Sequence, residues 1–541
     1  MNDKIFATCQ ITGNKIPVNK DSVIFFCGIG GIGMSGIAKL LFKMGYVNIC
    51  GSDSSDGGNV ESLRKMGIHV CVGHHEENIT KCKLGTVDIM VKTTSIRDSN
   101  PENEAMKRQC VDLQNCAIIH RSDAVNIAAN GKKVALITGC HGKTTVTAMV
   151  ANMFKNVGVP ANVLVGGIMQ NVGENYDFCE GAEWLVLEGD ESDGSFLKTK
   201  YNIGVVTNID ADHLDYYGDF DDVMKAFETF AFNGVDDDAK LILCNCKNIK
   251  QLYSTISGPD YIGINGKKMA SKITLTDSES HNVIFNSESN EIKVFNSPTV
   301  DASQAKTIIF AKHTMANIVA TCCVAKALLP KDEDVGLKLA KAIVSFEGVD
   351  RRFSIIGRNL FADVVNGKVA ATDKDVVDKD AAREEADSSI VPVSDGVVGD
   401  KSLFVDDYAH HPVEIAATIE SAKKVDLVDK FGKRGRIVAV FQPHRYTRTR
   451  DLMVEFGDAL SFADKVFVTE IYEASEDTIE GVTPEALCAK IAKKCDAEVC
   501  SSLPYALADI VKNNIKDGDI WLFLGAGNIS VRCREALNFK A

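Results

Sequence analysis

Twice in this chain an apolar strand runs directly into a glycine-rich turn and then into a helix. The first turn lies in residues 26–36, FCGIGGIGMSG, and the second in residues 138–145, TGCHGKTT. On both sides of each turn, apolar segments of strand length alternate with helical patterns. This alternation is typical of doubly wound parallel sheets, whose ligands bind at the carboxyl ends of the strands. We therefore predict an α/β protein with two anion-binding turns.

The length of 541 residues predicts about three domains. From where the strand and helix signals start afresh, we expect domains at residues 1–129, 130–346 and 347–541. The first and third should be Rossmann-like, and the central domain should resemble a P-loop ATPase. Residues 366–400 are rich in Asp, Lys, Ala and Val without a clear period. We expect them to form a solvated insertion in the third domain.

Composition excludes several classes of protein. The formal net charge of -14 argues against nucleic-acid binding, which needs a basic face. The 17 cysteines include no C-x-x-C pair, which favours free thiols in a reducing compartment over disulfides or structural zinc. Residues 1–22 are too polar for a signal peptide, and the apolar run 23–38 is short and broken by glycines. We predict a cytoplasmic protein without a membrane partner.

The first turn matches G-x-G-x-x-G through Gly28, Gly30 and Gly33, and Asp53 follows Gly33 by twenty residues. This spacing is typical of dinucleotide-binding enzymes, in which the glycines approach a pyrophosphate and the acid binds a ribose. By itself it indicates an NAD dehydrogenase. However, backbone N–H groups at a helix N-terminus bind any diphosphate, so another ligand fits equally well.

The second turn, G-x-x-G-K-T-T, is a shortened phosphate loop, since Ile137 stands where the Walker pattern has its first glycine. Lys143 would reach terminal phosphates, and the Thr144 hydroxyl would bind magnesium. Two later apolar strands end in the acidic clusters 188–193 and 210–213. Beside a phosphate loop, these clusters predict one or two metal sites.

The third domain carries two loops dense in ionisable groups, DDYAHHP at residues 406–412 and FQPHRYTRTR at residues 441–450. Their arginines can clamp a carboxylate or a phosphate, although a basic loop on an acidic protein is the plainer alternative. A metal site at the histidine pair is less favoured, because no Cys or Glu lies at ligand spacing. Arg351 and Arg352, at the domain junction, can reach a γ-phosphate or form an interdomain salt bridge.

The motifs, and their order along the chain, resemble those of the Mur ligase family of peptidoglycan synthesis. Within that family they resemble the branch that adds alanine. The matching segments are GIGGIGMSGIA, TGCHGKTT, EGDESDGSF, TNIDADHLD, GVDRRF, DDYAHHPVEI, FQPHRYTRTRDL and LFLGAGNI. The resemblance implies an ATP- and Mg²⁺-dependent amide bond between L-alanine and the lactyl carboxylate of UDP-N-acetylmuramate, formed through an acyl phosphate. The three domains would hold the UDP, the ATP and the amino acid in turn, in a monomer or dimer.

The resemblance also implies residue roles. It assigns substrate binding to Gly28, Gly30, Gly31, Gly33, Asp53, Thr94, Ser95, Tyr408, His410, His444, Arg445 and Arg448. It assigns ATP binding to Gly139, Cys140, His141, Gly142, Lys143, Thr144, Thr145, His313, Asn317, Arg351 or Arg352, and Asp406 or Asp407. It assigns metal binding to Thr144, Glu188 and His213, and catalysis to Lys143, His410, His444, Arg445 and Arg448. Whether His410 or His444 acts on the alanine amine stays open.

Three positions depart from the family pattern. Thr314 replaces the usual Asn beside the adenine, and Cys140 replaces the usual Thr of the phosphate loop. At a helix N-terminus Cys140 is expected to be a reactive thiolate. The modified lysine of several other Mur ligases would fall at Phe227, and Lys225 is two positions away, which suits the alanine-adding branch.

Three alternatives remain open. A sister ligase that attaches a whole tripeptide to UDP-N-acetylmuramate shares the nucleotide motifs, but the run FQPHRYTRTRDL favours the single-alanine enzyme. An NAD dehydrogenase leaves the second phosphate loop unexplained. A non-catalytic nucleotide-binding regulator does not need the set Lys143, Glu188 and His213.

Overall fold

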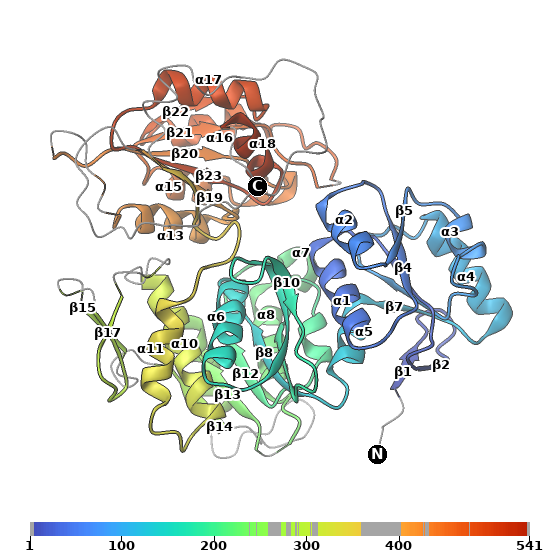
Figure 1. Cartoon of the computed structure of the whole chain (residues 1–541). Coiled ribbons are helices and arrows are strands. Elements are labelled where there is room, and N and C mark those ends of the chain that lie inside the picture. Colours follow the sequence, from blue (N-terminus) through green and yellow to red (C-terminus); the bar gives the residue numbers. More distant parts are fainter. Residues whose placement is uncertain are drawn as a thin grey trace. The chain divides into compact units, whose positions relative to one another are not determined.

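The computed structural model in Figure 1 forms two compact units. The first comprises Met1–Ile284, Ile292–Val300 and Ala316–Glu347, and the second comprises Phe285–Glu291, Asp301–Met315 and Gly348–Ala541. The structure describes residues 5–257 (without 237 and 245), 272–276, 283–286, 289, 291–302, 305, 312–358, 402–425, 427, 432–474 and 476–537. The expected insertion at 366–400 lies outside the described residues.

The first sheet of the first unit is parallel and has the order β5-β4-β3-β6-β7. Its strands are β3 (Ile24–Cys27), β4 (Ile49–Asp53), β5 (His69–Val72), β6 (Ile89–Lys92) and β7 (Ala117–His120). β3 is buried along its whole length, as expected for a parallel strand covered on both faces. The strand order reverses between β3 and β6, which is where ligands bind in such sheets. This is the predicted Rossmann-like arrangement.

The helices around this sheet are α1 (Ile32–Lys43), α2 (Gly58–Lys65), α3 (Glu77–Thr80), α4 (Pro101–Leu113) and α5 (Arg121–Ala129). Ahead of the sheet lies an antiparallel hairpin of β1 (Ile5–Thr8) and β2 (Lys15–Val18). This hairpin was not predicted, because its short strands are only half buried and form no continuous apolar run like that of β3. Their buried residues alternate with exposed ones, the pattern of a half-covered sheet.

The second sheet of the first unit has seven strands in the order β10-β9-β11-β8-β12-β13-β14. They are β8 (Lys133–Thr138), β9 (Ala161–Met169), β10 (Glu174–Asp177), β11 (Trp184–Glu188), β12 (Ile203–Val206), β13 (Lys240–Leu243) and β14 (Lys272–Leu275). β10 pairs antiparallel with β9, and the other pairings are parallel. β8, which precedes the phosphate loop, lies between β11 and β12. The sheet therefore places both acidic clusters beside that loop.

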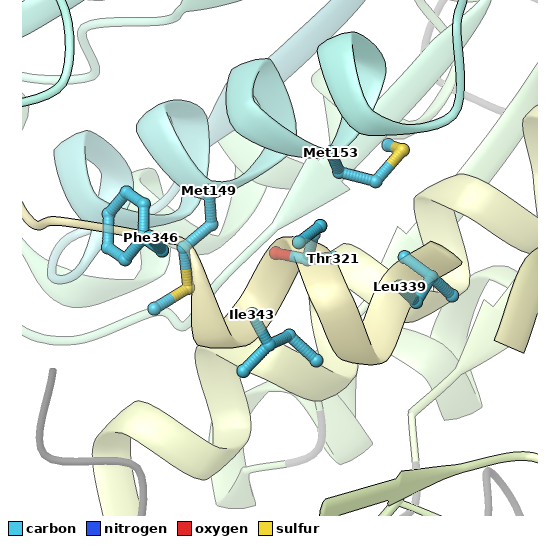
Figure 2. Close-up of a pocket in the computed structure, with 7 residues that line it drawn as sticks. Met149, Met153, Thr321, Leu339, Ile343 and Phe346 are labelled. Atoms are coloured by element: carbon cyan, nitrogen blue, oxygen red, sulfur yellow. The ribbon is translucent and has the colours of Figure 1, made fainter. Parts of the chain in front are cut away.

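The helices of this part are α6 (Lys143–Asn156), α7 (Leu214–Tyr217), α8 (Phe220–Ala231), α9 (Lys247–Ile256), α10 (Lys312–Leu328) and α11 (Val335–Val344), with the 3-10 turn η1 (Ser195–Lys198). A small apolar pocket lies between α6, α10 and α11 (Figure 2). It is lined by Met149, Met153, Thr321, Leu339, Ala342, Ile343 and Phe346. None of these side chains titrates, so the pocket offers no group for acid–base chemistry. A further small sheet contains β15 (Val283–Asn286), β16 (Glu291–Val294) and β17 (Val300–Asp301).

The main sheet of the second unit has the order β18-β19-β23-β20-β21-β22. Its strands are β18 (Ser354–Arg358), β19 (Leu403–Asp407), β20 (Ile437–Phe441), β21 (Lys465–Val468), β22 (Asp496–Val499) and β23 (Ile520–Leu524). All pairings are parallel except that of the edge strand β18 with β19. The helices are α13 (Pro412–Ala422), α14 (Tyr446–Asp451), α15 (Met453–Leu460), α16 (Pro484–Ile491), α17 (Pro504–Asn514) and α18 (Ile529–Ala536).

This sheet is covered on both faces. Val405 and Leu522 pack with α13, α15 and α16, whereas their chain neighbours Phe404 and Trp521 pack with α17 and α18. Consecutive strand residues point to opposite faces, so two separate cores require helices on each side. The three-domain α/β prediction is thus confirmed, while the exact boundaries at 129/130 and 346/347 stay predictions. Within the described residues, no helix is both long and apolar enough to cross a membrane.

Candidate functional site

The first glycine turn joins β3 to α1. Its backbone is fixed by β4, because the N–H groups of Gly28 and Ile29 donate to the carbonyl of Ser52 at 2.8 and 2.9 Å. The N–H of Gly30 donates to Asp53 Oδ2 at 2.8 Å. A Cβ on Gly30 would lie 2.9 Å from that same oxygen, so a larger residue would displace the Asp53 carboxylate. Asp53, predicted as a substrate-binding residue, holds the backbone of the turn itself.

Thr94 and Ser95 follow β6, the strand next to β3 across the switch point. The adjacent Ile96 touches the first turn, since its Cδ1 lies 3.4 Å from where a Cβ on Gly28 would be. The sheet therefore brings the two predicted substrate loops to one edge. Their role in binding a substrate stays a prediction.

A buried carboxylate lies beneath this edge. Glu102 Oε2 accepts hydrogen bonds from Ser52 Oγ at 2.7 Å and Cys27 Sγ at 3.0 Å, and lies 2.9 Å from His74 Nδ1. Cys, His and Glu are metal ligands, but ligands around a tetrahedral zinc ion are roughly 3.3–3.7 Å apart. The shorter separations here are those of hydrogen bonds. This cluster, which sequence reasoning missed, stabilises the ends of β3 and β4.

The second turn joins β8 to α6, and the end of β12 holds it in place. The N–H of His141 donates to Asn208 Oδ1 at 2.8 Å, and Thr207 Oγ1 donates to the carbonyl of His141 at 2.7 Å. Gly142, with a φ of 80°, adopts the left-handed conformation just before the helix begins. The free N–H groups of the first turn of α6 then point at the loop, which is the geometry of a phosphate site.

Lys143, the first residue of α6, is surrounded by acidic groups. Its Nζ lies 2.8 Å from Glu191 Oε1 and also donates to the carbonyl of Cys140 at 3.2 Å. Burial alone would lower the pKa of Lys143, but Glu191, Asp190 and Glu188 outweigh it and raise the pKa. Lys143 is therefore a fully charged cation at the mouth of the loop.

Two of the three predicted metal ligands are in direct contact. Thr144 Oγ1 donates to Glu188 Oε1 at 3.0 Å, and Glu188 Oε2 accepts from the N–H of Gly166 at 2.7 Å. His213, the third predicted ligand, contacts Glu191 instead, with its Nε2 3.4 Å from Glu191 Oε1. Glu191 in turn pairs with Lys143, the residue before Thr144. A hydroxyl and a carboxylate are hard oxygen donors of the kind that Mg²⁺ prefers. These residues therefore fit the predicted magnesium site.

The prediction that Cys140 is a reactive thiolate is wrong. Its side chain is buried, 6% exposed, and its Sγ accepts the N–H of Asp210 at 3.1 Å. Burial first, and then the charge of Glu191, raise the pKa of the Cys140 thiol well above its ordinary value. The helix N-terminus does not compensate, because α6 begins three residues later, at Lys143.

We accordingly expect Cys140 to resist alkylation in the folded protein. Treatment with N-ethylmaleimide at pH 7.5, followed by peptide mass spectrometry, should label the partly exposed Cys179 at least ten times faster than Cys140, because only an accessible thiolate reacts. Equal labelling of the two in the native protein would contradict the buried assignment.

The segment predicted to face adenine is only partly described. The side chain of His313 lies outside the described residues, and Thr314 is buried. Asn317 lies against the phosphate loop, with its Oδ1 3.2 Å from where a Cβ on Gly142 would be.

Phe227, the position where several other Mur ligases would have their modified lysine, is a core residue. Its ring packs on that of Phe196, with ring centroids 5.2 Å apart.

In the second unit, the neighbours Asp406 and Asp407 end β19 but contact different groups. Asp406 accepts hydrogen bonds from Ser530 and from Arg534, the latter at 3.2 Å. Asp407 accepts the N–H groups of Ala409 and Phe353, each at 2.8 Å. Burial raises the pKa of Asp407 to about 6. Of the two, Asp407 is the one that shapes the DDYAHHP loop.

An arginine pair brackets Tyr408. The guanidinium groups of Arg351 and Arg352 lie 4.8 and 5.0 Å from the centre of the Tyr408 ring. Arg351 also donates to the carbonyls of Gly525 and Gly527, at 2.7 and 3.1 Å. The GVDRRF and DDYAHHP motifs are therefore one structural site within the second unit.

The predicted histidines lie next to each other. The rings of His410 and His444 are 5.9 Å apart, and the His444 ring stacks on Tyr472 at 5.4 Å. Burial, and then the positive charges of His410 and neighbouring arginines including Arg448, lower the pKa of His444 to about 3. His444 is therefore a neutral imidazole at ordinary pH. Tyr472 was not predicted, because no motif marks it and an isolated β-bridge brings it to His444.

Backbone strain also marks these residues. His213, Arg351, Phe353 and Arg445 have positive φ angles of 56, 59, 52 and 72°. Residues other than glycine rarely adopt this conformation. Those that do are often found at functional sites. Arg445 is held there by its N–H, which donates to the carbonyl of Tyr472 at 2.8 Å.

The chain is similar to known protein families and to individual proteins over most of its length. The chain matches models of the Mur ligase family catalytic domain over residues 23–132, the Mur ligase middle domain over 137–325 and the Mur ligase glutamate ligase domain over 396–527. It is 34% identical to the UDP-N-acetylmuramate–L-alanine ligase of Rhizobium etli over 94% of each chain. It is likewise 34% identical to the ligase of the same name from Brucella anthropi, over 95% of this chain and 96% of the other.

Two solved structures share the fold. The UDP-N-acetylmuramate-alanine ligase of Thermotoga maritima gives a TM-score of 0.63 at 24% identity, covering 95% of this chain and 98% of the other. The murein peptide ligase of Psychrobacter arcticus gives a TM-score of 0.59 at 18% identity, covering 95% of this chain and 98% of the other. At these identities the likeness extends to the fold alone.

Proposed function

The chain belongs to the Mur ligase family, and we propose on this premise that it attaches L-alanine to the lactyl carboxylate of UDP-N-acetylmuramate in peptidoglycan synthesis. Mur ligases are ATP-dependent, so ATP is the energy source. The observation that carries the proposal is the 34% identity to named alanine ligases over nearly the whole of both chains.

The chemistry explains why a phosphate loop is needed. A carboxylate does not react with an amine at neutral pH. Transfer of the γ-phosphoryl group of ATP to a lactyl carboxylate oxygen releases ADP and leaves an acyl phosphate. The alanine nitrogen then attacks the acyl carbon, inorganic phosphate leaves, and the nitrogen gives up a proton. Both reactants of the first step are negative, so the site must neutralise charge and align them.

In this proposal Lys143 and the helix N-terminus hold the terminal phosphates. Thr144, Glu188 and His213 would hold a magnesium ion, which lowers the charge repulsion between the reactants when it is bound. The contact of Thr144 with Glu188 at 3.0 Å supports this placement. The glycines of the first turn would hold the diphosphate of the UDP-sugar, as a substrate rather than as a redox cofactor.

The second unit supplies the amino-acid side of the proposal. Arg445 and Arg448 would bind carboxylates, and Tyr408, His410 and His444 would surround the alanine. His444 is neutral, so a lone pair of its imidazole is available to orient the amine or to accept its proton. Arg351 or Arg352 would reach the ATP phosphates. The meeting of the two units around one substrate stays part of the proposal.

The test is phosphate release from ATP and Mg²⁺ with UDP-N-acetylmuramate and one candidate acceptor at a time. We expect release with L-alanine at least 100-fold above the rate without an amino acid. The tripeptide L-alanyl-γ-D-glutamyl-meso-diaminopimelate should give no increase. A preference for the tripeptide would identify the sister ligase instead, and no turnover with either would leave a nucleotide-binding regulator.

A further inference from the structure

We propose that Glu191 makes nucleotide binding depend on a divalent cation, by pairing with Lys143 until a cation takes over its charge. The proposal rests on the proposed function, since it takes a nucleotide as the ligand of the second glycine turn. Glu191 belongs to the acidic cluster 188–193, in which only Glu188 was predicted to bind a metal.

The position of Glu191 is the first support. Its side chain is 2% exposed, and its Oε1 lies 2.8 Å from Lys143 Nζ and 3.4 Å from His213 Nε2. It thus touches one residue proposed to hold phosphate and one proposed to hold the metal.

The second oxygen of Glu191 is the second support. Its Oε2 is buried and has no hydrogen-bond partner among the described residues. A buried carboxylate oxygen without a donor is costly and rare. The cost is explained if this oxygen belongs to a binding site and receives its partner only with the ligand.

Glu191 cannot easily follow Lys143 when the lysine turns towards a phosphate. Its backbone carbonyl accepts the hydroxyl of Tyr217 at 2.5 Å and the N–H of Gly194 at 3.0 Å. The neighbouring Asp190 is bound to Arg121. With this anchored backbone, the carboxylate stays where it is after the lysine leaves.

The consequence is an electrostatic coupling. A nucleotide without metal must separate Lys143 from Glu191, which leaves a buried negative charge beside the incoming phosphates. A divalent cation that arrives with the nucleotide offsets that charge. The coupling must act in both directions, so the nucleotide also strengthens cation binding.

The test is ADP binding by calorimetry, once in EDTA and once with Mg²⁺, for the wild type and Glu191→Gln. We expect the variant to bind metal-free ADP about 10-fold more tightly, because one repulsive charge is removed. Mn²⁺ binding to the ADP-bound protein, followed by electron paramagnetic resonance, should weaken about 10-fold. By the thermodynamic cycle, the preference for metal-bound over metal-free ADP should therefore also fall about 10-fold, while the affinity for metal-bound ADP stays nearly unchanged.

Asp193→Asn is the matched control. It removes one charge from the same loop, but Asp193 faces Arg121 and His120, so the metal dependence should stay within about threefold of wild type. Glu191→Asp keeps the charge but shortens the side chain, so it should change the metal dependence by an intermediate amount. This variant provides the test if Glu191→Gln does not fold. Circular dichroism verifies folding.

Two outcomes separate the proposals. If wild-type protein binds no ADP under either condition, the proposed function fails together with this inference. If it binds ADP with a metal preference that Glu191→Gln and Glu191→Asp leave unchanged, or if both variants weaken metal-free binding, only the role of Glu191 is overturned.

Discussion

Replacing Lys143 with alanine should lower the rate of ligation by about 10²–10³-fold, the loss typical of one preorganised charged contact in a transition state. Lys143 is the cation at the start of α6, and its 2.8 Å contact with Glu191 shows that its ammonium already lies inside the site. Phosphoryl transfer concentrates negative charge there, and water cannot replace a fixed cation. The measurement is kcat for phosphate release with saturating UDP-N-acetylmuramate and L-alanine.

Lys155→Ala is the appropriate control, since it removes the same side chain from the opposite end of the same helix. Lys155 is exposed in the last turn of α6, about 18 Å along the helix axis from Lys143. Its replacement should leave kcat within about twofold of wild type. If Lys143→Ala keeps more than a tenth of the wild-type rate, the second glycine turn is not the ATP site.

Replacing His444 with alanine should slow amide formation by about 10²-fold, the low end of the contribution of a general base, because a low pKa makes it a weak base. Burial lowers the pKa of His444 from 6.5 to about 3, so the imidazole is neutral above that pH and can accept a proton from the alanine nitrogen. Its Nδ1 is buried and has no hydrogen-bond partner among the described residues. Consequently, the rate should show no loss from protonation of His444 between pH 5 and pH 8.

The step affected can be isolated. Hydroxylamine traps an acyl phosphate without needing a protein base, so His444→Ala should still release ADP when hydroxylamine replaces alanine. His69→Ala, a histidine change on β5 of the first sheet, should alter neither reaction. If His444→Ala loses the hydroxylamine reaction to the same extent as ligation, His444 serves phosphoryl transfer or folding instead.

Sequence patterns located the strands, the two glycine turns and the residues that follow them. Buried parallel strands such as β3 and β8 are read from short apolar runs, because both of their faces are covered. The hairpin of β1 and β2 was missed, since its strands are half buried and four residues are too few to show the alternation of such a strand. The hydrogen bond of Asp53 to Gly30 was also not foreseen, because a spacing of twenty residues does not reveal which atom the carboxylate meets.

Cys140 shows where local reasoning failed. Its place beside a helix N-terminus predicted a low pKa, but the surrounding residues, not the helix, decide its charge. Tyr472 shows the opposite case, since no motif marks it and an isolated β-bridge places its ring on His444.

The sequence by itself determined the α/β class, the family and the residue types of the candidate sites, because each depends on local order along the chain. Only the tertiary structure decided which of those residues meet. Glu188, Glu191 and Lys143 come together because β11 lies beside β8 in the sheet, although 45 residues separate Lys143 from Glu188 along the chain. Charge and pKa depend on burial and on neighbours distant in sequence, so the neutral His444 and the pairing of Lys143 with Glu191 emerge only once the chain is folded.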